Sequence, residues 1–136
     1  MNANPKSIAH LAIAVKSLKD VVPLWEKAFG IQASAVEEVT SQKVRTQFLV
    51  VGGLRLEFLE PTSSDSPISG SLDKRGNSFH HLAIEVDGID GQLAALKQSG
   101  FSLINEKSVS GADDCKVGFL HPKALGGLLV ELVEHS

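Results

Sequence analysis

Two stretches of the chain, residues 8–15 and 79–86, share one pattern of apolar and polar positions. On one face most residues are large and apolar, and on the other most are small or polar, which is the period of a β-strand with one buried face. The apolar faces carry Leu11, Ile13 and Val15 in the first stretch and Leu82, Ile84 and Val86 in the second. Each opposite face carries one histidine, His10 or His81, beside a small alanine. The pattern predicts two related strands, each with a core face and a histidine face.

A second pair of stretches, residues 54–60 and 128–134, also matches. Their apolar triplets correspond in order: Leu54, Leu56 and Phe58 in the first, and Leu128, Val130 and Leu132 in the second. Glu57 and Glu131 occupy the same register, each on the face opposite its triplet. The chain is therefore interpreted as an internal duplication that carries one histidine and one glutamate per copy.

The segments between these strands predict the same order of elements in both copies. In the first copy, Ser17 is an expected N-cap and Gly30 an expected end of a helix, because apolar residues recur between them at helical spacing. The second copy has an apolar stripe within residues 89–100, for which Asp87 is the expected cap. The remaining strands are predicted at residues 33–40 and 44–51 in the first copy, and at 101–104 and 116–120 in the second. A short helix is expected to start at Ser66-Pro67 and run to Gly76.

These elements predict an α+β fold of two βαβββ modules. We expect one domain over residues 1–136, with module one at 7–61, a polar connector at 62–77 and module two at 78–135.

Composition narrows the class of protein. The chain has 136 residues, 43% of them apolar, and a net charge of −3, with no basic cluster that favours nucleic-acid binding. No apolar run is long enough for a membrane span, and residues 1–7 lack the apolar core of a signal peptide. The single cysteine, Cys115, excludes an internal disulfide and suits a reducing compartment. We therefore expect a soluble, cytoplasmic protein that binds neither nucleic acid nor membrane.

The four repeated polar residues indicate a metal site. If the two copies pack about a pseudo-twofold axis, His10, Glu57, His81 and Glu131 can converge on one point. Buried together they would be costly without a counter-ion, and a divalent cation removes that cost. Two nitrogen and two oxygen ligands suit Co, Mn, Ni, Fe or Zn, and six-coordinate geometry leaves two positions open for water or substrate. An open position is typical of a catalytic metal site.

With these residues the chain resembles the vicinal oxygen chelate superfamily, which has the glyoxalase fold, and within it is similar to the methylmalonyl-CoA epimerases over residues 8–133. The specific motifs are Leu59-Glu60-Pro61, Asp65-Ser66-Pro67-Ile68, Lys74-Arg75-Gly76, Phe79-His80-His81, Phe119-Leu120-His121-Pro122-Lys123 and the segment from Gly126 to Leu132. The resemblance implies a cupped mixed sheet around the metal, with His10, Glu57, His81 and Glu131 as ligands. It also implies cobalt as the metal, with Mn, Ni, Zn or Fe as alternatives, and a homodimer.

The implied activity interconverts (2R)- and (2S)-methylmalonyl-CoA, an acyl-CoA substrate that links propionyl-CoA breakdown to succinyl-CoA. Removal of the α-proton gives a metal-stabilised enolate, and reprotonation on the opposite face inverts the centre. The resemblance implies that Glu131 is both a ligand and one of the two proton carriers. Several relatives have a second glutamate on the third strand, where this chain has Thr46, so the second proton carrier stays open.

Three other functions compete with the epimerase interpretation. A glyoxalase-type lyase or isomerase would use the same fold on another substrate, such as a glutathione adduct. A non-catalytic small-ligand-binding protein of this fold has no need of four ligands in register. A ring-cleaving dioxygenase is disfavoured, because its iron site uses two histidines and one carboxylate, and Glu57 adds a fourth ligand.

Overall fold

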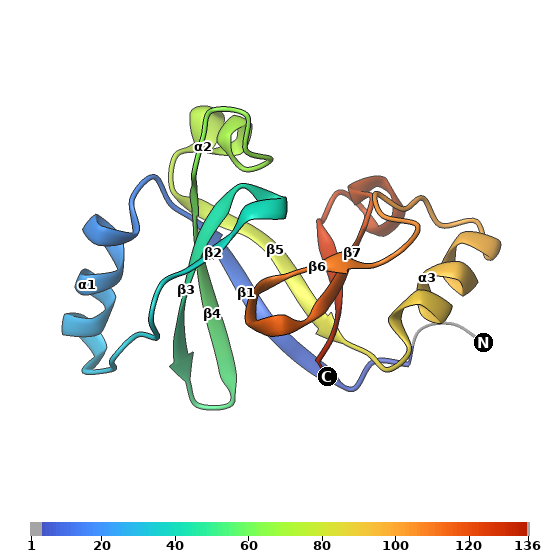
Figure 1. Cartoon of the computed structure of the whole chain (residues 1–136), viewed down its shortest axis with the longest axis horizontal. Coiled ribbons are helices and arrows are strands. Elements are labelled where there is room, and N and C mark those ends of the chain that lie inside the picture. The colour runs from blue at the N-terminus through green and yellow to red at the C-terminus, as the bar shows by residue number, and fades with distance from the viewer. Residues whose placement is uncertain (1–3, 136) are drawn as a thin grey trace. The chain divides into compact units, whose positions relative to one another are not determined.

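The structure is a computed structural model that describes residues 4–135. Its α-helices are α1 (Leu18–Phe29), α2 (Ser69–Arg75) and α3 (Ile89–Gln98) (Figure 1). Its strands are β1 (Ser7–Ala14), β2 (Glu37–Val39), β3 (Val44–Val51), β4 (Leu54–Pro61), β5 (Ser78–Glu85), β6 (Val109–Ser110), β7 (Lys116–Leu120) and β8 (Val130–Glu134). Omitting the connecting helix α2, the order is βαβββ twice, and the predicted α+β class is confirmed. None of the helices within residues 4–135 is long and apolar enough to cross a membrane.

The chain divides into two compact units whose boundaries fall within strands. The first unit is residues 10–80, and the second begins at His81 and also contains the segment before His10. Strands β1 and β5 therefore each contribute residues to both units.

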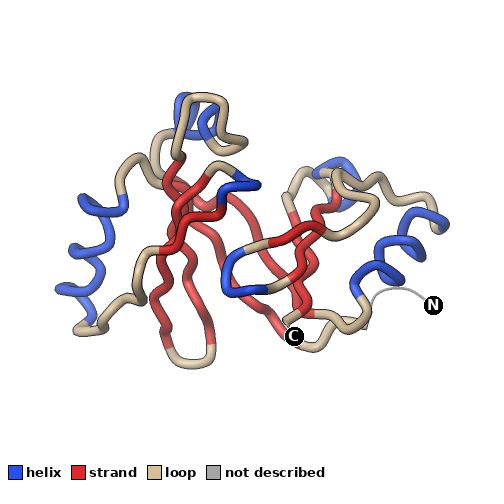
Figure 2. Tube along the Cα trace, in the orientation of Figure 1, coloured by secondary structure: helices blue, strands red, loops and turns tan. Residues whose placement is uncertain are grey.

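The first unit contains the strand order β2-β3-β4-β1, in which β1 and β4 are parallel and the other pairs antiparallel. A short turn at Gly52-Gly53 joins β3 to β4, and Figure 2 shows this hairpin as two adjacent strands connected by a loop. Helix α1 packs on β4 through a core of apolar side chains. That core consists of Ile13, Val15, Leu18, Val22, Leu49 and Phe58.

Helix α1 begins and ends where its local sequence predicts. The Ser17 side chain accepts a hydrogen bond from the Asp20 N–H at 3.3 Å, which satisfies one of the free donors of the first turn. Gly30 ends the helix in the left-handed conformation, with φ of 65°, which glycine adopts without steric cost. The predicted helix from Leu18 to Gly30 is confirmed.

The second unit repeats the arrangement of the first. Its strand order is β5-β8-β7-β6, with β5 and β8 parallel and the other pairs antiparallel. Helix α3 packs on β7 and β8, and its predicted inward residues are all buried. The core consists of Val86, Ile89, Leu93, Leu96, Leu120 and Leu132.

Two predicted strands are shortened or absent for the same physical reason: the strand expected at 33–40 is confirmed only over β2 (Glu37–Val39), and the one expected at 101–104 is not formed. Residues 33–36 form no strand, because the Phe48 N–H bonds to the side-chain oxygen of Ser34, at 2.9 Å, instead of to a backbone carbonyl. Residues 101–104 form only a single bridge, and there the Phe119 N–H bonds to the side chain of Asn105, also at 2.9 Å. In both modules a side-chain acceptor replaces the backbone acceptor and interrupts the ladder.

The predicted cap of α3 is also wrong. Asp87 instead pairs with Lys6, and the N-cap position belongs to Gly88. The carboxylate of Glu134, at the end of β8, accepts hydrogen bonds from the N–H groups of Gly88 and Ile89 at 2.7 and 3.0 Å. These bonds hold the pKa of Glu134 below its ordinary value.

The first module has the equivalent arrangement at the end of β4. There Glu60 accepts a bond from the Leu18 N–H at 2.9 Å, at the start of α1. Glu60 follows Glu57 by the same three positions that separate Glu134 from Glu131. Both helices thus receive a carboxylate from the strand that also carries the repeated glutamate.

Two smaller predictions are corrected as well. The connector helix begins at Ser69 and not at Pro67, because residues 66–68 form turns in which the Ser69 N–H bonds to the Ser66 carbonyl. Leu128 was expected on a core face, but it lies before β8 and is 69% exposed.

Candidate metal centre

The structure brings the four predicted ligands together as two pairs, one in each unit. In the first unit, His10 lies on β1 and Glu57 on the neighbouring strand β4, where Ala12 pairs directly with Glu57. The Nε2 atom of His10 is 3.2 Å from Oε1 of Glu57. Both residues are buried, although their side chains are polar.

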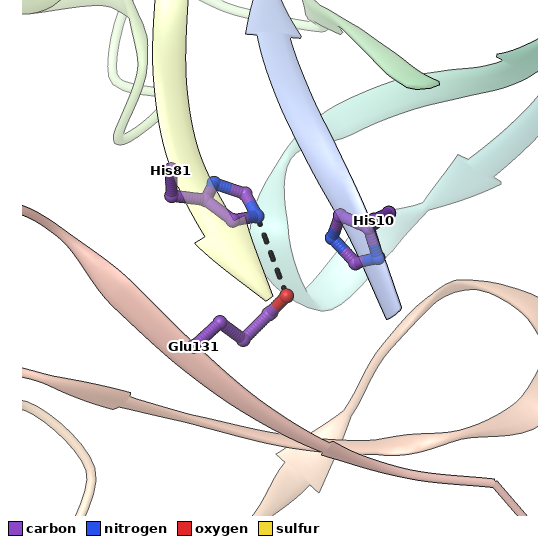
Figure 3. Close-up of side chains that lie close together, drawn as sticks. All are labelled: His10, His81 and Glu131. Atoms are coloured by element: carbon purple, nitrogen blue, oxygen red, sulfur yellow. Dashed lines mark ion pairs between the residues drawn. The ribbon is translucent and has the colours of Figure 1, made fainter. Parts of the chain in front are cut away.

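The second unit repeats this pair. Ala83 on β5 pairs directly with Glu131 on β8, and Nε2 of His81 is 3.3 Å from Oε1 of Glu131 (Figure 3). Both residues are again buried. The two pairs agree in ligand atoms, register and burial, which is the correspondence that the sequence duplication predicts.

Each pair also has a phenylalanine beside it, which the sequence analysis did not single out. Phe48 lies directly opposite Glu57 on β3, and its ring meets the His10 ring in an edge-to-face contact at 6.3 Å. Phe119 lies directly opposite Glu131 on β7 and meets the His81 ring in the same way at 5.1 Å. The signal was present in the sequence, since both phenylalanines precede their glutamates within matching strand pairs.

Packing of this kind fixes the orientation of an imidazole. An apolar ring against one edge of each histidine restricts rotation of the histidine ring. The ring nitrogen Nε2 is thereby held toward the glutamate of the same pair, as the two short distances record. Each unit therefore presents one oriented nitrogen and one oxygen donor.

Thr46 is buried on the same face of β3 as Phe48, two residues away. Its hydroxyl is 3.5 Å from the backbone carbonyl of Glu37, and Glu37 is its direct partner on β2. Directly opposed residues of an antiparallel pair project from the same face of the sheet. The carboxylate of Glu37 therefore projects from the same face of the sheet as Thr46, one strand away.

Comparisons with known proteins agree with the repeated architecture. Residues 9–119 match the family model described as Glyoxalase/Bleomycin resistance protein/Dioxygenase superfamily. The chain is 37% identical to the uncharacterized protein YqjC of Bacillus subtilis (strain 168), over 92% of this chain and 89% of that protein. It is also 37% identical to the mitochondrial methylmalonyl-CoA epimerase of Mus musculus, over 90% of this chain and 70% of that protein.

Solved structures give the same result. The methylmalonyl-CoA epimerase of Mycobacterium tuberculosis superposes with a TM-score of 0.93 at 29% identity, covering 100% of this chain and 92% of the other. A methylmalonyl-CoA epimerase in complex with methylmalonyl-CoA and NH4+ superposes with a TM-score of 0.92 at 29% identity, covering 98% of this chain and 96% of the other. The resemblance and the fold that the sequence indicates are thus confirmed. The chain belongs to the Glyoxalase/Bleomycin resistance protein/Dioxygenase superfamily and has the glyoxalase fold.

Proposed function

We propose that this protein is a metal-dependent epimerase that interconverts (2R)- and (2S)-methylmalonyl-CoA. The observation that carries the proposal is the duplicated pair of buried ligands, His10 with Glu57 and His81 with Glu131. Relatives named methylmalonyl-CoA epimerase, which are 32–37% identical to this chain, support the proposal. A solved structure of the same fold that holds methylmalonyl-CoA adds to that support.

In this proposal the two pairs together hold one divalent ion. Two buried imidazoles and two buried carboxylates form an N₂O₂ donor set that fits a first-row divalent metal. Buried carboxylates are costly without a cation to compensate their charge. The donor chemistry therefore fits the group. Cobalt is our proposed metal, and Mn, Ni, Zn and Fe are its competitors.

The chemistry starts with loss of the α-proton from the substrate. A divalent ion in this site supplies Lewis-acid stabilisation for the negative charge that develops on the thioester oxygen. A carboxylate oxygen of Glu131 accepts the α-proton on one face, or returns it there in the reverse direction.

Inversion needs a second proton carrier on the opposite face of the substrate. Thr46 is unsuited to this role, because a hydroxyl is neither a base nor an acid of useful strength near neutral pH. Glu37 is our candidate, since its side chain projects from the same face as Thr46 and is exposed to solvent. In this proposal the Glu37 carboxylate, on the strand next to Thr46, is the second proton carrier.

The proposal is tested by assaying epimerisation with metal-free protein and after stepwise addition of Co²⁺, Mn²⁺, Ni²⁺ and Zn²⁺. We expect no turnover without metal and restored turnover with at least one ion. Glu131→Gln should abolish turnover with every ion while the circular dichroism spectrum is retained. Glu106→Gln is the matched control, because Glu106 is exposed and forms an ion pair with Lys97. Full activity in metal-free protein contradicts metal dependence, and activity only toward a glutathione hemithioacetal moves the assignment to a glyoxalase.

Three further statements belong to this proposal. The protein acts as a single domain of two modules, 7–61 and 78–135, forms a homodimer and resides in the cytoplasm. Light scattering of the purified chain measures the oligomeric state, and fractionation of the source cells measures the compartment.

A further inference from the structure

A cavity of the first unit lies where β1 and β4 end. Its volume is about 320 Å³, and Figure 1 shows α2, which forms one of its walls, beyond the end of β4. The residues that define its chemistry are Lys16, Pro61, Thr62, Ser64, Leu72 and Asp73. All of them lie within residues 10–80, so the cavity is formed by the first unit alone.

The turn between β4 and α2 is ordered by its own contacts. The Ser69 hydroxyl donates to the Ser63 carbonyl at 3.0 Å, which joins the start of α2 to the turn. The carboxylate of Asp65 forms an ion pair with Lys43 and accepts a hydrogen bond from the Ser63 hydroxyl. The charge of Asp65 is therefore balanced within the turn.

The polar groups that remain in the wall of the cavity are one cation, two hydroxyl groups and one carboxylate. Within residues 4–135, no ion pair or side-chain hydrogen bond is found for Lys16, Thr62, Ser64 or Asp73. An ammonium group and hydroxyl donors together suit a phosphate group. A carboxylate repels a phosphate, but it accepts hydrogen bonds from the hydroxyl groups of a ribose. The four groups together match a ligand that carries both.

We propose that this cavity binds a phosphorylated ribose, with Lys16, Thr62 and Ser64 at the phosphate and Asp73 at a ribose hydroxyl. Pro61 and Leu72 supply the apolar part of the wall. A volume of about 320 Å³ lies at the lower end of the range of small-ligand sites, which suits one phosphorylated ribose and not a whole dinucleotide.

The place of the cavity identifies coenzyme A as the source of this group. Pro61 follows Glu57 by four residues on β4, so both project from the same face of the strand. Four residues of a strand span about 13 Å. The pantetheine arm of coenzyme A has about as many backbone bonds as four extended residues and so a similar length, roughly 13 Å. An acyl group at the His10–Glu57 pair would thus place the phosphorylated ribose beyond Pro61. Naming coenzyme A rests on the proposed function, whereas the binding of a phosphorylated ribose does not.

NMR titration, which measures dissociation constants into the millimolar range, tests the cavity on EDTA-treated protein. The probes are adenosine 3′,5′-bisphosphate, adenosine and inorganic phosphate, and the proteins are the wild type, Lys16→Met, Lys16→Arg and Asp73→Ala. We expect Lys16→Met to weaken the bisphosphate and inorganic phosphate by about tenfold, because a charged hydrogen bond is lost, and to leave adenosine unchanged. Lys16→Arg should retain the binding of phosphate.

Asp73→Ala should act in opposite directions on two probes. It removes the acceptor of the ribose hydroxyl and so weakens adenosine, and it removes a negative charge and so tightens inorganic phosphate. Lys27→Met is the control, since Lys27 is an exposed lysine of α1 in the same unit, and it should change no affinity. Absence of bisphosphate binding to the wild type would overturn the proposal. Changes of the same size for adenosine and phosphate in Lys16→Met would also overturn it.

Titration with coenzyme A separates the two sources of the ligand. Weakening of coenzyme A and the bisphosphate by the same factor in Lys16→Met supports coenzyme A as the source. Weakening of the bisphosphate alone would overturn that part and identify a free nucleotide as the ligand. Lys16-dependent binding of coenzyme A to a wild-type protein without epimerase activity would keep this inference and refute the proposed reaction, so the two failures are distinguishable.

Discussion

The remote capping of α3 by Glu134 gives a prediction whose size follows from the structure. Glu134→Gln keeps the shape of the side chain and one neutral acceptor, but removes the charge that faces the N–H groups of Gly88 and Ile89 at 2.7 and 3.0 Å. A charged acceptor at a helix N-terminus also interacts favourably with the helix dipole, by about 0.3–1 kcal/mol. Together with the weakened cap, we expect a loss of about 1 kcal/mol in the free energy of unfolding at pH 7. That loss corresponds to a decrease of about 4 °C in Tm.

The loss should depend on pH in a defined direction. The pKa of Glu134 is lower in the folded protein than the ordinary value of a glutamate, chiefly because of the two backbone hydrogen bonds. A lowered folded pKa means that the stabilisation is fully present above the unfolded pKa and is lost as the pH falls through the folded pKa. The difference between wild type and Glu134→Gln should therefore be constant between pH 6 and 7 and shrink below about pH 4.5.

Urea unfolding followed by circular dichroism, at pH 7 and at steps down to pH 3, measures this difference. Glu106→Gln is the control, because its exposed ion pair with Lys97, at 2.5 Å, is expected to contribute only about 0–0.5 kcal/mol. An effect of Glu134→Gln that is equal at pH 7 and pH 3, or no larger than that of the control, would refute the capping argument.

Three other changes test separate parts of the account. His81→Ala should lower the metal content of the purified protein, measured by atomic emission. His80→Ala, at the adjacent and half-buried histidine, should not. Equal metal content in the two variants would exclude His81 as a ligand. Gly118→Ala should destabilise the fold by about 1–3 kcal/mol in urea, because the added Cβ would lie 2.8 Å from a methyl carbon of Leu93, and a neutral result would mean that α3 moves freely on β7. Glu37→Gln should slow epimerisation while Glu131-dependent proton exchange continues, and an unchanged rate of inversion would exclude Glu37 as the second proton carrier.

The sequence predicted the parts of the fold that local signals determine. Helix α1 begins after Ser17 and ends at Gly30 as expected. An N-cap hydroxyl and a left-handed glycine each determine a helix end through contacts within one turn of the helix. Alternation of apolar residues likewise predicted β1, β3, β4 and β5 to within one residue at either end.

The errors arise where a distant residue supplies the hydrogen bond. Asp87 was a reasonable cap by local rules, but Glu134 occupies those donors from 46 residues away. The side chain of Ser34 accepts the hydrogen bond of the Phe48 N–H, and the side chain of Asn105 accepts that of the Phe119 N–H. These bonds end the backbone hydrogen-bond ladder, and the alternation of apolar residues along a strand does not predict them. Such pairings become visible only when the strands are placed side by side.

The sequence predicted the four ligand residues of the candidate site, but not the side chains that pack around them. The duplication identified His10, Glu57, His81 and Glu131 as equivalent residues, and the structure finds them as two buried pairs of matching geometry. Their joint role as metal ligands stays a prediction. The two phenylalanines, Phe48 and Phe119, were not identified, because their importance depends on which side chains contact one another and not on spacing along the chain.

The proposed epimerase reaction can be measured as α-proton exchange of (2S)-methylmalonyl-CoA in D₂O, with inversion followed on the same samples by chiral analysis. Metal-free protein and protein with added Co²⁺ are compared at equal concentration. We expect deuterium incorporation together with inversion only when the metal is present, and neither with Glu131→Gln. Exchange without inversion would mean that a single proton carrier works and that Glu37 does not serve as the second. No exchange in protein shown to bind the metal would contradict the proposed epimerase.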